Sequence, residues 1–335
     1  QGEQHWQSEV LRELEQPFVW TEAPLVRIAL IQGLSVSELI LVCHHAIADG
    51  LSAVTLIQEL LTLLDQPDQT ISKRATPSSL ESLLPQSISI SNLQLFLARV
   101  ILRLRRFNQP AQPGSNQLQL SSGTLSPTVT TALIQRCRQE DTTVHSAICT
   151  ALLFALAIDQ NKTTLKCFSP INVRPYLRSH SSEDCGLYIS PAQTTHAIAS
   201  DSQFWQMARL FKTSLKLQTN ENHLRKLAQQ TELLMATQPD PNRLQQIFLE
   251  QYDSDVMVTN LGQLSTSQQF GSLKLEAIYG SAVLSGFSTE RVLGVATLGN
   301  QLYFTFVYSA HQLSSTTTPD LAQQAMRLIE SAISA

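Results

Sequence analysis

The chain has 335 residues, of which 43% are apolar and 15% charged, and its 23 basic and 27 acidic residues give a formal net charge of −4. This length and composition are typical of a globular protein with a large core, and they favour two packed lobes over one compact unit. The charge balance provides no positive field, which excludes nucleic acid as the expected partner. No apolar run reaches the roughly 18 residues that a membrane span requires. Five cysteines without zinc-finger spacing favour a reducing, cytoplasmic setting.

The first elements predict a helix followed by a β-hairpin. Apolar residues recur at helical intervals over residues 4–15, and two apolar runs of strand length cover residues 25–32 and 38–45. Helical spacing returns over residues 50–64. Strand, tight turn and helix therefore follow one another, and the run HHAIADG at residues 44–50 lies where they meet.

The middle of the chain is interpreted as a connection between two lobes. Residues 66–91 and 108–123 are rich in serine, proline and glutamine, and a helical pattern over about 92–107 separates them. We therefore divide the chain into an N-terminal lobe, residues 1–115, in which the connection begins at about residue 66, and a C-terminal lobe, residues 116–335.

The C-terminal lobe begins with two predicted helices. Ser126, before a proline, and Thr143 are good N-cap residues. A strand over about 164–173 is ended by a proline, so that Arg174 lies at its end. Helical patterns cover much of residues 201–252. The other segments are predicted strands at 187–195, 256–260, 273–284, 291–298 and 301–308, followed by a helix that starts at Thr318-Pro319.

The histidine pair is the first candidate for chemistry. Successive side chains of a strand point to opposite faces, so His44 and His45 cannot both serve one small site, and one of them is expected to be structural. Both faces are largely apolar, so periodicity alone does not choose between the two. A neutral imidazole can take a proton from an alcohol or amine. Asp49 could pair with an arginine, and Gly50 permits a backbone approach that a Cβ would block.

The run HHAIADG matches all four fixed positions of the HHxxxDG motif. It resembles the superfamily of nonribosomal peptide condensation domains, chloramphenicol acetyltransferase-like enzymes and polyketide-associated acyltransferases. Weaker matches follow the family's order in PLVRIALI, INVRP, CGLYISP, VTNLG and FTFVYSAHQLS. The resemblance implies an α/β fold of two chloramphenicol acetyltransferase-like lobes that form a pseudo-dimer, with a channel between them that donor and acceptor enter from opposite faces.

The resemblance also implies a role for each motif residue. The second motif histidine, His45, would be the general base, and His44 would be structural. Asp49 would hold the turn through a salt bridge to Arg174, the arginine of INVRP, and Gly50 would support the same turn. A plain ion pair between Asp49 and Arg174 is the alternative, and it is structural too.

The reaction implied by the family is attack of a hydroxyl or amine on an acyl thioester, with His45 removing the proton. Acyl-CoA or a phosphopantetheinyl carrier would be the co-substrate, an acyl-carrier protein a candidate partner, and no cofactor would be bound. Asn260 and Gly262, in the segment that crosses between lobes, are candidates for lining the channel. The sequence has no GxSxG elbow, in agreement with a reaction without an acyl-enzyme.

Three alternatives stay open. A metal site at His45 and Asp49 is disfavoured because no third ligand has a recognisable spacing. The helix near residues 92–107 is interpreted as an ordinary packed helix, although its arginines also allow contact with a membrane surface or with donor phosphates. Only 43 residues precede His44, which predicts a shortened N-terminal lobe and leaves a non-catalytic condensation-like module, binding an acyl carrier, a lipid or a partner protein, as a second hypothesis.

Overall fold

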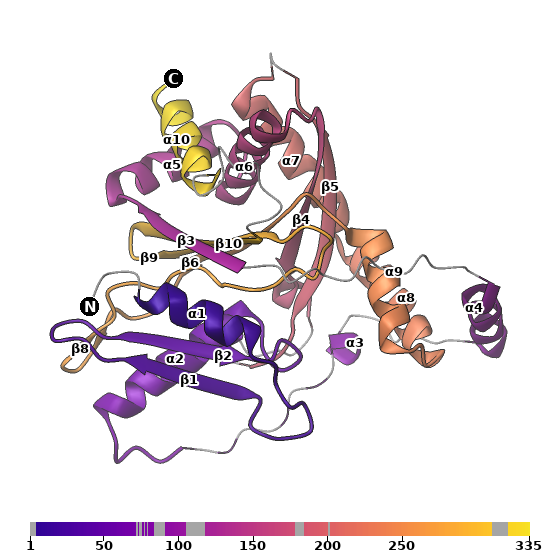
Figure 1. Cartoon of the computed structure of the whole chain (residues 1–335), viewed down its shortest axis with the longest axis horizontal. Helices are drawn as coiled ribbons and strands as arrows, with labels where there is room; N and C mark the ends of the chain where they lie inside the picture. The colour runs from indigo at the N-terminus through magenta and orange to yellow at the C-terminus, as the bar shows by residue number, and fades with distance from the viewer. Residues whose placement is uncertain are drawn as a thin grey trace.

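The computed structural model describes residues 5–71, 73, 76, 78, 80–83, 91–104, 118–177, 184–199, 202–309 and 321–335. They form one lobe around a two-stranded hairpin and a second lobe around a six-stranded sheet (Figure 1). The helices are α1 (His5–Glu15), α2 (Gly50–Asp65), α3 (Leu80–Leu83), α4 (Asn92–Leu104), α5 (Pro127–Gln139), α6 (Val144–Gln160), α7 (Phe204–Gln218), α8 (Glu221–Ala236), α9 (Pro241–Tyr252) and α10 (Leu321–Ser334), with a 3-10 turn at Arg174–Tyr176. The strands are β1 (Val26–Ile31), β2 (Glu38–Cys43), β3 (Leu118–Leu125), β4 (Thr164–Asn172), β5 (Ile189–Ala197), β6 (Val256–Leu264), β7 (Gln269–Phe270), β8 (Leu273–Lys274), β9 (Arg291–Leu298) and β10 (Gln301–Ser309).

The predicted hairpin is confirmed, but its second strand is shorter than expected. β1 and β2 pair antiparallel, with Val26 opposite Cys43. Beyond Cys43 the chain turns, and the Ile47 N–H donates to the His44 carbonyl at 3.0 Å. The histidines therefore lie in the turn and not in the strand. Strand alternation, which we used to separate them, does not govern where their side chains point.

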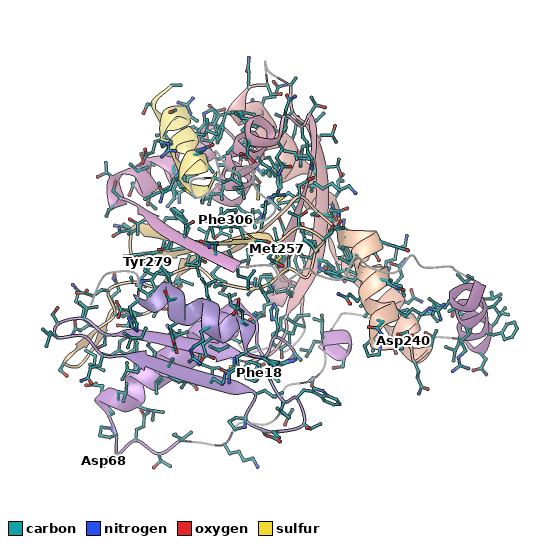
Figure 2. The ribbon with its side chains drawn as sticks, in the orientation of Figure 1. Phe18, Asp68, Asp240, Met257, Tyr279 and Phe306 are labelled. Atoms are coloured by element: carbon teal, nitrogen blue, oxygen red, sulfur yellow. The ribbon has the colours of Figure 1, made fainter. Side chains whose placement is uncertain are left out.

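The large sheet has the strand order β3-β10-β9-β6-β4-β5. Helices α5, α6, α7 and α10 cover one of its faces (Figure 1). The N-caps that start α5 and α6 are confirmed, because Ser126 Oγ accepts from the Val129 N–H and Thr143 Oγ1 from the Ser146 N–H. β9 is buried along its whole length, as expected for a strand covered on both faces. Phe306, on the neighbouring strand β10, lies at the middle of this core (Figure 2).

Two segments differ from the sequence-based expectation. Residues 118–123, interpreted as connection, belong to β3, an edge strand paired antiparallel with β10 from Leu118 opposite Ser309 onward. Serine and glycine made this segment resemble a loop, and its partner lies far along the chain. Of the strand expected over 273–284, only β8 forms. Residues 275–290 cross β9 without regular pairing, because Gly280 and Gly294 bring the two backbones too close together for a Cβ on either.

The same crossing segment joins the two lobes. β7 and β8 lie beside α2, where the Asp65 carboxyl occupies the space that a Cβ on Gly271 would fill. Val54 of α2 then packs in one apolar cluster with residues of the second lobe, namely Leu264, Ile278, Ala296, Leu298 and Tyr303. The lobes therefore share a core where the chain passes between them.

Helix α4 is not the ordinary packed helix that we expected. Of its apolar stripe, Leu93, Phe96, Leu97 and Ile101 are exposed, while Val100 is half-buried. Arg103 and Leu104 have side chains outside the described set, and Arg105 and Arg106 lie outside the described residues. Within the described chain no single helix has the length and apolar character of a membrane span. Among the described helices, only α5 and α6 taken together have that length and apolar character, and the two helices are bent by 101° relative to each other.

The close approach at Gly280 gives a test of the crossing. A Cβ there would lie 2.1 Å from the Gly294 carbonyl carbon, a contact that only backbone movement can relieve. We expect Gly280→Ala to lower the free energy of unfolding by about 3 kcal/mol, measured by urea denaturation. Gly286→Ala is the matched control. It has open space but a φ of +70°, so we expect a loss of about 1 to 2 kcal/mol. Equal losses of unfolding free energy in the two variants would contradict a close backbone approach at Gly280.

Candidate active site

The motif turn holds His45 in one tautomer. Its Nδ1 lies 2.9 Å from the Ala48 carbonyl oxygen. A carbonyl oxygen only accepts hydrogen bonds, so Nδ1 carries the proton and donates it, which leaves Nε2 unprotonated in the neutral ring. The His45 side chain is exposed, whereas Ala48 is buried. The turn therefore presents an imidazole whose second nitrogen is able to accept a proton.

His44 makes different contacts, all within its own lobe. Its ring meets Phe18 edge-on, with centroids 5.7 Å apart, and its Nδ1 accepts from the Ala46 N–H at 3.2 Å. Phe18 in turn carries the Arg27 guanidinium 4.0 Å above its ring. These contacts support the structural role inferred for His44.

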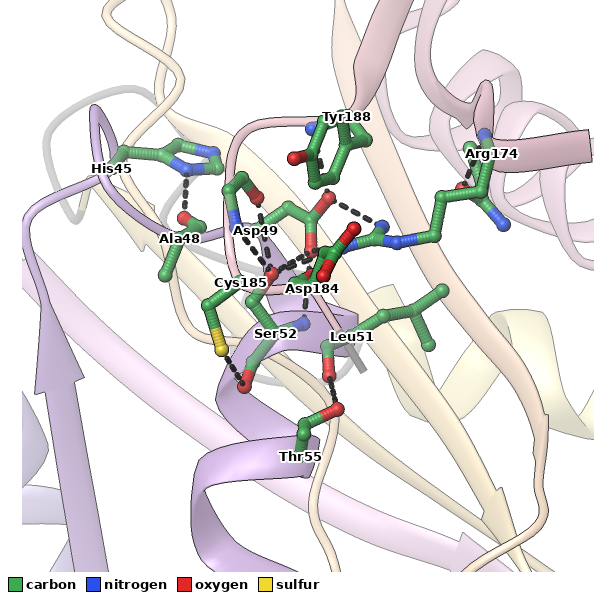
Figure 3. A network of polar contacts seen from close by, with 12 residues as sticks. His45, Ala48, Asp49, Leu51, Ser52, Thr55, Arg174, Asp184, Cys185 and Tyr188 are labelled. Atoms are coloured by element: carbon green, nitrogen blue, oxygen red, sulfur yellow. Dashed lines mark hydrogen bonds and ion pairs between the residues drawn. The ribbon is translucent and has the colours of Figure 1, made fainter. Parts of the chain in front are cut away.

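Asp49 forms the centre of a buried network that spans both lobes (Figure 3). Its Oδ2 lies 2.6 Å from Arg174 Nη1 and its Oδ1 3.1 Å from Nη2, which is a two-pronged ion pair between side chains only 3% and 8% exposed. The same carboxylate caps α2 by accepting from the Ser52 N–H at 2.9 Å, and it accepts from the Tyr188 N–H at 3.0 Å. The two residues that the sequence paired are therefore in contact.

Ser52 is a part of this network that sequence reasoning missed. Its hydroxyl donates to Asp49 Oδ1 at 2.9 Å and accepts from Arg174 Nη2 and from the Gly186 N–H, both at 3.0 Å. The Asp49 N–H donates to the Gly186 carbonyl. Ser52 stands three residues after the N-cap, a position that commonly contacts the cap, and this was the available signal.

The electrostatics of the network favour an ionised Asp49. Burial opposes the charge, but the hydrogen bonds from Arg174 and from the N–H groups of Ser52 and Tyr188 outweigh it, so the pKa of this carboxyl lies below its ordinary value. The guanidinium of Arg174 also lies 4.7 Å from the centre of the Tyr188 ring. The pair is neutral as a unit, and both carboxylate oxygens and both terminal guanidinium nitrogens are hydrogen-bonded, whereas Arg174 Nε is buried without a partner among the described residues.

Gly50 lies in close contact with side chains of the other lobe. A Cβ at this position would lie 2.4 Å from Leu261 Cδ2 and 3.0 Å from Ser281 Oγ. Its φ does not lie in the left-handed region, so a larger residue here would meet the Leu261 side chain and not backbone strain. Leu261 had no signal of its own in the sequence.

Asn260 and Gly262 form the bulge that directs Leu261 to this contact. The pairing of β6 with β9 shifts register between Asn260 and Gln263. Asn260 Oδ1 accepts from the Gly262 N–H at 2.8 Å, and Gly262 has a φ of +73°, which favours glycine. Both residues are partly exposed. Their role in lining a channel stays an expectation.

Cys43, directly before the motif, does not have the character of an activated thiol. All five are free, and burial raises the pKa of Cys43, with Cys185 nearby as a further cause. A raised pKa disfavours the thiolate, so Cys43 is a partly buried packing residue and not a nucleophile. Among the described residues, no three histidine, cysteine, aspartate or glutamate side chains gather as metal ligands would.

Solved structures with the same fold include a polyketide synthase associated protein and an acetyltransferase. Polyketide synthase associated protein 5 from Mycobacterium tuberculosis aligns with a TM-score of 0.63 at 16% identity, covering 93% of this chain and 76% of that one. The trichothecene 15-O-acetyltransferase TRI3 from Fusarium sporotrichioides aligns with a TM-score of 0.66 at 11% identity, covering 93% and 71%. The two-lobed fold is therefore that of the chloramphenicol acetyltransferase-like proteins, as the motif implied.

Sequence comparison gives the family. The model of the family described as phthiocerol/phthiodiolone dimycocerosyl transferase C-terminus matches residues 114–312, and the chain belongs to this acyltransferase family. The "Probable alcohol acetyltransferase FCK4" of Fusarium pseudograminearum is 25% identical over 219 residues, which is 54% of this chain. The match spans 44% of that relative's length. The superfamily inferred from HHxxxDG is thereby confirmed.

The ion pair predicts a large stability loss on truncation. Arg174→Ala leaves the buried Asp49 carboxylate without its cation, and we expect it to lower the free energy of unfolding by about 3 to 5 kcal/mol. Arg209→Ala is the control. It removes a guanidinium that is 44% exposed and pairs with Glu140 at 2.6 Å, and we expect a loss below about 1 kcal/mol. Chemical denaturation measures both, and similar losses would show that the pair contributes little.

The low pKa of Asp49 also predicts a pH dependence. An ionised Asp49 stabilises the fold above its ordinary pKa, near about 3.9. That stabilisation is lost as the pH falls through the lower folded-state value. The difference in unfolding free energy between the wild type and Asp49→Asn should therefore be constant from about pH 5 to 8 and should shrink below about pH 4. A difference that stays constant down to about pH 3 would argue against an ionised Asp49.

Proposed function

We propose that this chain is an acyltransferase that moves an acyl group from a thioester donor, acyl-CoA or an acyl-carrier protein, to a hydroxyl or amine acceptor. The observation that carries the proposal is the hydrogen bond from His45 Nδ1 to the Ala48 carbonyl. It holds the imidazole in the form a general base needs, with Nε2 as the acceptor. The family match and the alcohol acetyltransferase relative support acyl transfer and favour a hydroxyl acceptor.

In the proposed reaction, Nε2 of His45 takes the proton of the acceptor as its oxygen or nitrogen bonds to the thioester carbonyl carbon. The tetrahedral intermediate then collapses and the carbon–sulfur bond breaks. The leaving thiolate takes the proton from the imidazolium, so the thiol departs and His45 returns to its neutral form. The Ala48 carbonyl keeps the ring oriented and stabilises the imidazolium while it exists. The chain itself forms no covalent bond to the acyl group.

Asp49 is proposed as a brace and not as a partner of the base. Both of its oxygens are engaged by Arg174 and by N–H groups of Ser52 and Tyr188. Nδ1 of His45 is instead held by the Ala48 backbone carbonyl. This differs from a Ser-His-Asp triad, in which a carboxylate orients the histidine. Loss of Asp49 should therefore act on activity through the fold.

The base assignment predicts a large and specific loss of rate. We expect His45→Ala to lower kcat/KM by about 10² to 10⁴ with an unchanged circular dichroism spectrum, because only the proton acceptor is lost. The measurement is thiol release from a panel of acyl-CoA donors with simple alcohol and amine acceptors.

His44→Ala is the matched control for this experiment. It removes the neighbouring imidazole, which contacts Phe18, and we expect it to keep activity to within about tenfold. Equal rates for the wild type and His45→Ala would exclude His45 as the base. Donor turnover with alcohols but not with amines would assign the acceptor class.

A further inference from the structure

Helix α4 turns an apolar stripe to solvent. The side chains of Leu93, Phe96, Leu97 and Ile101 are 66%, 62%, 49% and 61% exposed. Positions 93, 97 and 101 are one helical turn apart and position 96 lies beside them, so the four side chains share one face. A contiguous apolar face of this kind on a folded protein marks a surface that binds something.

The described part of the chain holds α4 by its other side. Arg243 of α9 donates to the Leu102 carbonyl at 2.6 Å, and Arg99 donates to the Ala236 carbonyl at the end of α8 at 3.5 Å. The helix lies at the edge of the molecule, beyond α8 and away from both sheets (Figure 1). Its side chains project outward there (Figure 2). The stripe is thus presented on a projection, where a flat surface can reach it.

The stretch of sequence that contains the stripe carries a positive net charge, although the whole chain is negative. No aspartate or glutamate occurs between Glu81 and Glu140, although the chain has 27 acidic residues. Arg99 falls at the middle, and Arg103, Arg105 and Arg106 in the C-terminal half, of the helix that the sequence predicts over about 92–107. In sequence terms, residues 82–117 carry four arginines and no acid, a local charge of +4 against −4 for the whole chain.

We propose that α4 is an interfacial helix that binds an anionic lipid surface. The stripe of Leu93, Phe96, Leu97 and Ile101 would enter the boundary of headgroups and acyl chains, and the positive charge of the surrounding sequence would be attracted to the lipid phosphates. The 13 residues of α4 are about 20 Å long, too short to cross a bilayer but sufficient to lie in its surface. The proposal does not depend on the activity of His45.

Charge favours this occupant over a second copy of the chain. A two-fold contact between identical α4 faces would bring together two sequence stretches that each carry a local charge of +4 and no acidic residue. An anionic lipid surface provides both the negative charge and the apolar layer that the stripe lacks. It also requires no matching groove.

The test is co-sedimentation of the full chain with vesicles. We expect binding to phosphatidylcholine vesicles that contain about 30% phosphatidylglycerol, and at least about tenfold weaker binding to pure phosphatidylcholine. Raising the salt from about 0.1 to 0.5 M should weaken the binding to anionic vesicles. Phe96→Gln/Leu97→Gln should reduce that binding by about tenfold or more, since it removes two inserted side chains at exposed positions.

Leu64→Gln/Ile158→Gln is the matched control. It replaces two exposed side chains, 60% and 75% accessible, on α2 and α6, and it should bind vesicles as the wild type does. Thermal unfolding confirms that each variant is folded. Absence of wild-type binding to the anionic vesicles, or equal loss in both double variants, would overturn the proposal. So would a wild-type dimer in sedimentation equilibrium that Phe96→Gln/Leu97→Gln converts to a monomer, because the stripe would then be a subunit contact.

Discussion

The buried ion pair of Asp49 and Arg174 is the interaction on which the arrangement of this molecule depends. It joins the motif turn of one lobe to the end of β4 in the other, across 125 positions of sequence. Removing both charges from water is costly, and only the close pairing and the additional hydrogen bonds from Ser52 and Tyr188 offset that cost. Because any displacement of one lobe would leave a buried charge unpaired, the pair disfavours alternative positions of the lobes. It sets the geometry in which His45 is presented.

In the motif, a backbone carbonyl orients the proposed base, and the Asp49 side chain keeps the turn in shape. The imidazole of His45 is oriented by the Ala48 carbonyl, so its tautomer depends only on the shape of a four-residue turn. That shape is kept by Asp49, whose carboxylate starts α2 and whose N–H donates to the Gly186 carbonyl. A carboxylate that both caps a helix and fixes a second lobe need not touch the base to support it. The neighbouring His44 belongs to the hairpin through Phe18.

Local patterns in the sequence were sufficient for the elements that local interactions decide. Ser126 and Thr143 marked the starts of α5 and α6, and apolar, β-rich runs of strand length marked the hairpin and β9. The contact between Asp49 and Arg174 was predicted through the family resemblance, since no spacing implies it. β3 was missed because its partner strand β10 lies far along the chain, with Leu118 opposite Ser309 and Leu125 opposite Leu302. The crossing at 275–290 was missed for a similar reason, as glycine packing between distant segments leaves no periodic signal. The solvent exposure of α4 was also missed, because an amphipathic pattern predicts a face but not whether the fold covers it.

The contact between Gly50 and Leu261 has a consequence for how the two lobes can change over time. The Leu261 side chain of one lobe occupies the space that a Cβ on Gly50 of the other lobe would fill, so the two positions are complementary in shape. Without Leu261 the space beside Gly50 would be left unfilled, and with a larger residue at position 50 the Leu261 side chain would have to move. The bulge at Asn260 and Gly262 sets the position of Leu261. A hybrid protein that joins this motif turn to the second lobe of a relative should therefore assemble well only if that lobe brings an equivalent bulge. The small size of Gly50 in the motif thus matches the position of Leu261 in the opposite lobe.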